Sequence, residues 1–196
     1  MLSPVGALSN GLELLADENN PEMRRRCLEL LEQSAQISAD KLKFFRLAYG
    51  AAGGFGEDVS SEEPRELIAA LIRANERLEL QWAVAEPRLP KTAVKILLNL
   101  GAIAIDALVR GGTLAVGAER RDGATEIAVR AAGPRVAFDP AIGKALDGTL
   151  AETELSGRTA PAHMIRLLAE EHGGGLQYAV TADALIMGAV LPDQAA

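Results

Sequence analysis

Few side chains in this sequence can act as nucleophiles. The chain has two histidines, His163 and His172, and one cysteine, Cys27. An imidazole can attack an electrophile or carry a proton, and a thiolate is a strong nucleophile. His163 lies among apolar residues of a predicted helix over 161–172, which favours a packing or surface role. His172 falls in its last turn, where a cationic side chain stabilises the helix dipole. Cys27 lies among apolar helix positions, which predicts a buried structural thiol.

The composition excludes several classes of protein. A net charge of -7 argues against a nucleic-acid partner, because binding a phosphate backbone needs a basic face. No apolar run approaches the ~20 residues of a membrane span, and the first residues lack the basic region of a secretory signal. A single cysteine excludes an internal disulfide framework. We therefore expect a cytoplasmic globular protein without membrane or nucleic-acid partners.

The first fifty residues predict two helices joined by a short polar turn. Val5, Leu8, Leu12 and Leu15 have helical spacing, and this helix should end near Ala16. Asn20 can cap a second helix, with Pro21 at its first position. The second helix should run to about Tyr49 and be on the order of 40 Å long. The two helices form an antiparallel hairpin.

This hairpin has more apolar positions than two helices can bury. The simplest solution is a second copy, which gives a homodimer with a four-helix bundle at the two-fold axis. The alternative packs the hairpin against the rest of its own chain. The expected dimer core consists of Val5, Leu8, Leu12, Leu15, Leu31, Leu42 and Phe45.

The pattern changes after a glycine-rich break at 51–56. We expect domains at 1–52 and 60–196. The second should hold helices after Ser61, over 90–108 and over 161–172. Alternating apolar residues predict strands over 78–84, 114–118, 125–131, 176–180 and 184–190. This order predicts an α+β fold in which helices cover one face of a mixed sheet.

The first residues of the chain contain a short motif that resembles one in a known protein family. Ser3-Pro4-Val5 resembles the second half of the H-E-x-x-T-P-L pattern on the phosphorylated helix of sensor histidine kinases. A proline there removes one backbone hydrogen bond and bends the helix. The resemblance implies that the acceptor histidine and its acidic neighbour would lie immediately before Met1, outside residues 1–196.

A closer resemblance is to the ChpT-type histidine phosphotransferases of alphaproteobacteria. The matching segments lie at residues 3–7, 10–15, 44–51 and 133–135, and the resemblance covers nearly the whole chain. It implies a homodimeric phosphorelay intermediate. Its partners would be the receiver domain of a hybrid histidine kinase and the receivers of response regulators. It also implies a C-terminal domain like a kinase ATP-binding domain that does not use ATP, with no cofactor and no metal.

The residues themselves support the absence of nucleotide chemistry. Asn99 matches the first asparagine of the kinase motif that binds Mg²⁺. The position of the second asparagine in that motif is occupied by Ile103. Kinases recognise adenine with the aspartate of a D-x-G-x-G motif. If Gly133 is the first glycine of that motif, Ala131 stands in place of the aspartate and Arg135 in place of the second glycine. Hard Mg²⁺ needs oxygen ligands, and adenine needs a carboxylate acceptor. No glycine-rich lid follows, because the segment 138–149 is short.

Receiver domains present acidic pockets, so a basic docking rim would favour encounter. Hairpin geometry places the start of the first helix beside the later half of the second. The expected receiver-docking residues are Ser3, Gly6, Ala7, Asn10, Lys41, Lys43 and Arg46. A solvated helix face is the alternative for the cations, and bundle packing is the alternative for Gly6 and Ala7. The basic run 24–26 lies at the other end and suits solubility and helix pairing.

Three functions remain open. The protein is an active phosphotransferase whose acceptor histidine lies upstream of Met1, or an adaptor that binds receivers without an acceptor. The third is a fragment of an ATP-using histidine kinase, which Ile103 and Ala131 disfavour.

Overall fold

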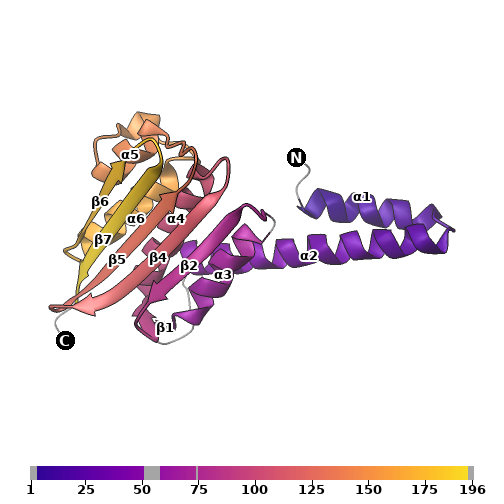
Figure 1. Ribbon diagram of the computed structural model, residues 1–196, viewed down its shortest axis with the longest axis horizontal. Coiled ribbons are helices and arrows are strands. Elements are labelled where there is room, and N and C mark those ends of the chain that lie inside the picture. Colours follow the sequence, from indigo (N-terminus) through magenta and orange to yellow (C-terminus); the bar gives the residue numbers. More distant parts are fainter. Residues whose placement is uncertain (1–3, 51–57, 74, 194–196) are drawn as a thin grey trace. The chain divides into compact units, whose positions relative to one another are not determined.

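The N-terminal residues form a helical hairpin and the remainder forms an α/β domain, as the sequence predicts (Figure 1). The computed structural model describes residues 4–50, 58–73 and 75–193, so the glycine-rich break and Ser3 lie outside the described residues. Two compact units meet within the second helix, one ending at Phe45 and the other beginning at Arg46.

The hairpin consists of α1 (Pro4–Asp17) and α2 (Pro21–Tyr49). Gly11 lies against α2, because an added Cβ would lie 2.7 Å from Leu31 Cδ2. Arg24 closes the other end, where its Nη1 donates to the backbone oxygens of Leu15 (3.0 Å) and Glu18 (2.8 Å). The Leu15 carbonyl belongs to the last turn of α1, where carbonyls lack helical partners, and Glu18 follows the helix.

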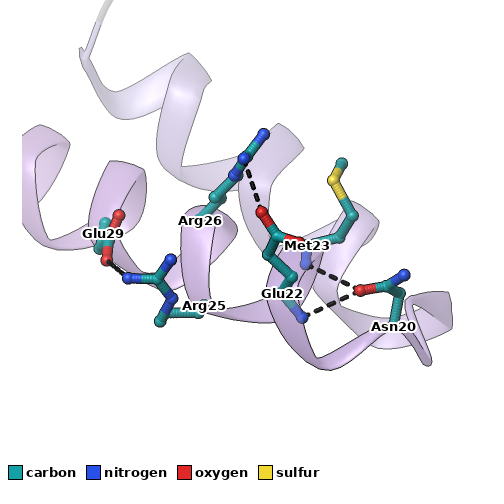
Figure 2. Close-up of polar contacts among 6 residues, drawn as sticks. All are labelled: Asn20, Glu22, Met23, Arg25, Arg26 and Glu29. Atoms are coloured by element: carbon teal, nitrogen blue, oxygen red, sulfur yellow. Dashed lines mark hydrogen bonds and ion pairs between the residues drawn. The ribbon is translucent and has the colours of Figure 1, made fainter.

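Asn20 caps α2 as the sequence predicts. Its Oδ1 accepts hydrogen bonds from the backbone N–H groups of Glu22 (2.9 Å) and Met23 (3.3 Å), as Figure 2 shows. The next turns of α2 add ion pairs between Arg26 and Glu22 (2.6 Å) and between Arg25 and Glu29 (3.2 Å). The basic run thus serves the hairpin's own turn.

We expect Asn20→Ala to destabilise the hairpin by about 1 kcal/mol, because two backbone N–H groups lose their acceptor. Thermal unfolding followed by far-ultraviolet circular dichroism should show a lower midpoint. Asn19→Ala is the matched control, since Asn19 makes only a 3.4 Å contact with the Asp17 carbonyl. Equal midpoints for the two variants would contradict the capping role.

The second unit contains the following elements: β1 (Asp58–Ser60), α3 (Glu62–Ile72), β2 (Leu78–Val84), β3 (Arg88–Pro90), α4 (Lys91–Ala107), β4 (Gly112–Arg121), β5 (Ala124–Ala132), α5 (Pro140–Asp147), the 3₁₀ turn η1 (Glu152–Glu154), α6 (Ala160–Glu171), β6 (Gly175–Val180) and β7 (Ala184–Pro192). Ser61 stands at the N-cap of α3 as expected, but its side chain makes no capping hydrogen bond.

The main sheet has the strand order β2-β4-β5-β7-β6 and is mixed. β2 runs parallel to β4, and the other neighbours are antiparallel. Asp122 (φ 51°) and Gly123 (φ 77°) form the tight turn between β4 and β5, which confirms the hairpin predicted there. β1 and β3 form a separate two-stranded sheet.

Helices α4 and α6 lie behind the sheet in Figure 1, which shows the sheet's other face. One register row illustrates the core face, where Val116, Val129 and Met187 are neighbours on β4, β5 and β7 and are all buried. The centre of the helical layer is α4, whose Ile96, Leu97 and Leu100 are fully buried. The fold class predicted from the sequence is confirmed.

Sequence reasoning missed α5. The signal was present, because the Asp139 side chain accepts from the Ala141 N–H (2.9 Å) and Pro140 occupies the first turn. Gly148 ends the helix in the left-handed conformation (φ 77°). Asp-Pro at one end and glycine at the other is the usual punctuation of a short helix.

Candidate functional site

Two regions carry the candidate residues: the open end of the helical hairpin and the turn region that follows β5. Ser3 lies outside the described residues. Gly6 and Ala7 on α1 are half-buried and Asn10 is exposed, while Lys41, Lys43 and Arg46 on α2 are all exposed.

The contact of Gly11 with Leu31 sets the register of the hairpin. Because the helices run antiparallel, Gly6 lies level with residue 36 of α2, and Lys41 lies about 7 Å further along the axis. The lysines therefore stand beyond Gly6, Ala7 and Asn10, at the level of the residues that would precede Pro4.

The cations at this end differ in their partners. Arg46 lies 3.9 Å from Glu63, an ion pair with both side chains largely in solvent and of small energetic weight. Lys41 and Lys43 form no ion pair within the described part of the chain. They are thus available to an anionic partner.

The expected dimer-core residues fall into two groups. Leu8, Leu15 and Leu31 are half-buried. Val5, Leu12, Leu42 and Phe45 are instead 63%, 60%, 69% and 53% exposed. The single chain leaves the side chains of this second group in water.

The second region holds the positions that the sequence motifs align with the nucleotide site of a kinase. Asn99 is 1% exposed on α4, its Nδ2 donates to the Lys95 carbonyl (2.8 Å), and its Oδ1 has no hydrogen-bond partner among the described residues. Ile103 and Ala131 are buried in the apolar core. A Cβ at Gly133 would clash with the Gly111 carbonyl, so this glycine serves the crossing of two backbone segments.

Three charged residues gather near the end of α4, and sequence reasoning missed them. Arg158 Nε lies 3.1 Å from Asp139 Oδ2. Burial raises the pKa of the Asp106 carboxyl, and the positive charge of Arg158 opposes part of that rise in pKa. Arg158 thus joins the segment after η1 to the start of α5. No pattern of residue types in the sequence marks these distant positions as neighbours.

The histidines hold structural positions. His172 Nδ1 lies 2.9 Å from the Leu168 carbonyl, which accepts only from a protonated nitrogen. Its Nε2 lies 3.1 Å from the Thr92 hydroxyl, so the ring ties α6 to the start of α4. His163 is half-buried on α6. Neither lies on the hairpin.

Within the described residues, no three His, Cys, Asp or Glu side chains gather in the manner of metal ligands. The helices that the structure describes include none with the length and apolar character to cross a membrane.

Comparison with known proteins gives concordant results. Residues 61–184 match the family model described as the histidine phosphotransferase C-terminal domain. The chain is 32% identical over 189 residues to protein phosphotransferase ChpT of Brucella abortus (strain 2308), covering 96% of this chain and 88% of that protein. A solved bacterial phosphotransferase matches with a TM-score of 0.80 and 32% identity, over 95% of this chain and 88% of its own.

The catalytic domain of histidine kinase ThkA shares the fold of the second unit. Its TM-score is 0.52 at 14% identity, over 69% of this chain and 94% of its own. At that identity the likeness concerns the fold alone.

Proposed function

This chain belongs to the histidine phosphotransferase family, and we propose that it passes a phosphoryl group between receiver-domain aspartates as a homodimer. The acceptor imidazole would belong to the helical turn immediately before Ser3. The observation that supports this proposal is the open end of the hairpin, where Lys41 and Lys43 are exposed, form no ion pair within the described residues, and would stand level with that turn.

The register of the hairpin indicates which residues of α2 would lie near the proposed acceptor. If α1 continues upstream of Pro4 in the same geometry, the residue before Met1 lies level with Lys41 to Lys43, by the spacing that the Gly11–Leu31 contact sets. An imidazole there would be exposed, with an acidic neighbour and Ser3 close enough to orient one ring nitrogen.

The chemistry at that place is a reversible displacement. The free imidazole nitrogen attacks the phosphorus of an aspartyl phosphate, a P–N bond forms, and the acyl P–O bond breaks to release the carboxylate. A carboxylate of a second receiver then reverses the step. Lys41 and Lys43 lie near enough to favour the docking of an acidic receiver surface.

The dimer proposal rests on the apolar surface of the hairpin. Val5 and Leu12 have heptad spacing on α1, and Leu28, Ala35 and Leu42 have it on α2. Antiparallel geometry places both rows on one side of the hairpin. Leu28 is 53% exposed in the single chain, like its neighbours in these rows. A second hairpin laid on this side would complete a four-helix bundle.

An adaptor that binds receivers without accepting phosphate remains the second candidate, because residues 1–196 place neither histidine on the hairpin. Both functions predict receiver binding. They differ in whether a chain extended by the His-Asp pair becomes labelled.

We expect no binding of ATP. The buried side chains of Ile103 and Ala131 supply no oxygen ligand and no carboxylate, and Arg135 occupies the place of a glycine. Isothermal titration with ATP and Mg²⁺ at concentrations up to about 1 mM should show no saturable heat, and the melting temperature should stay constant. Saturable binding below that concentration would favour a kinase fragment instead.

A further inference from the structure

The face of the main sheet that turns away from the helices, here called the open face, departs from the usual pattern. An antiparallel sheet with one solvated face normally carries polar side chains on it. Here one register row across four strands reads Ala83, Gly117, Ala128 and Gly188. These residues line a hollow of about 540 Å³ that involves all five strands.

The two glycines are not required by the fold. An added Cβ at Gly117 would meet nothing nearer than the Ala83 carbonyl at 3.6 Å, and at Gly188 nothing nearer than 3.4 Å. Neither glycine has a positive φ. Glycine weakens a strand interior. The sequence therefore keeps this surface hollow at a cost in sheet stability.

The walls of the hollow are apolar and acidic. Ile186 and Val190 on β7 stand on either side of the glycine row and are 46% and 42% exposed. Glu119 and Glu126 face each other directly across β4 and β5. Like charges in that position repel, and neither carboxylate forms an ion pair within the described residues. A cationic side chain placed between them would relieve the repulsion.

The dimensions select a helix rather than an extended segment. Ile186 and Val190 are four strand residues apart, which is ~13 Å, and a helix with its side chains is ~10–12 Å wide. Four strand spacings give a length of ~19 Å, which holds ~13 helical residues. From these observations we infer that the open face binds an amphipathic helix of a partner protein, with aliphatic residues on one side and Lys or Arg beside Glu119 and Glu126.

A second copy of this chain is a poorer occupant. Its net charge is -7, the basic run 24–26 is engaged within the hairpin, and Lys41 and Lys43 belong to the surface proposed for receivers. This inference is independent of phosphotransfer, because no hairpin residue takes part in it. Arg121 and Arg130 also stand on the open face, but Arg121 is paired with Asp122 (3.6 Å), and the charged residues that line the hollow are Glu119 and Glu126.

The test uses the full chain and a synthetic helical peptide of Leu, Ala and Lys, about 14 residues long, with one apolar side. Fluorescence anisotropy gives the affinity, and backbone amide shifts give the site. We expect shifts confined to open-face residues of the five strands that line the hollow, β2, β4, β5, β7 and β6. A peptide with Glu in place of Lys should not bind.

Two pairs of substitutions test whether the peptide binds in the hollow of the open face. Gly117→Val with Gly188→Val fills the hollow, should not lower the melting temperature, and should weaken binding about tenfold or more. Gly157→Val is the control, since nothing lies within 4 Å of its added Cβ. Glu119→Gln with Glu126→Gln should weaken binding about threefold or more and reduce its salt dependence. Glu152→Gln with Glu154→Gln is the control of equal charge change.

Four results would overturn the inference. These are equal binding of the Glu peptide, amide shifts outside the open face, and affinities that neither pair changes relative to its control. The fourth is a concentration dependence of the open-face shifts without peptide, which would make a second copy the occupant.

Discussion

Leu12→Asp is expected to convert the dimer into monomers at micromolar concentration. In the single chain this side chain is 60% exposed, so the substitution should cost the isolated hairpin little. In the proposed bundle it faces the second hairpin, where burying even a neutral polar group without a hydrogen bond costs roughly 2–7 kcal/mol and an unpaired carboxylate costs more. Light scattering coupled to gel filtration measures the mass directly.

Gln33→Asp is the matched control for this prediction. Gln33 is exposed on α2 and lies outside the heptad rows. Its replacement by Asp adds the same negative charge as Leu12→Asp. The control should remain a dimer. A monomeric parent protein, or a dimer that survives Leu12→Asp, would contradict the proposed interface.

Lys41→Glu with Lys43→Glu is expected to slow phosphoryl transfer from a receiver by about tenfold at low ionic strength, in a chain extended by the His-Asp pair. The two lysines are exposed and have no ion pair in the described part of the chain, so their replacement breaks no internal contact. The loss should shrink as salt is added, because screening weakens docking in both proteins.

Arg110→Glu with Lys144→Glu makes the same change in net charge within the second unit. It should leave the rate within about twofold of the parent. If both pairs slow transfer equally, the effect belongs to net charge and the lysines are no docking site.

The parts of the fold with local signals were predictable. Asn20-Pro21 marks the start of α2, and Asp122-Gly123 marks the β4–β5 turn, because the preferences of these residues act within a few positions. The helix α5 was missed although Asp139-Pro140 and Gly148 frame it, because its eight residues are too few for a clear periodicity.

The candidate site was less predictable, for a physical reason. The contacts between Arg158 and Asp139 and between His172 and Thr92 join residues far apart in the sequence. Such pairs depend on how helices stack on the sheet. In the same way, the hollow on the open face became visible only when strand register aligned Gly117 with Gly188 through Ala128.

The central claim is that the acceptor imidazole belongs to the turn before Ser3. The most direct measurement is the transfer of labelled phosphate from a phosphorylated receiver domain to residues 1–196 and to the same chain extended at its N-terminus by His-Asp. The account predicts labelling of the extended chain, loss of that label when the added histidine is changed to alanine, and no labelling of residues 1–196. Labelling of residues 1–196 that disappears with His163→Ala or His172→Ala would contradict it.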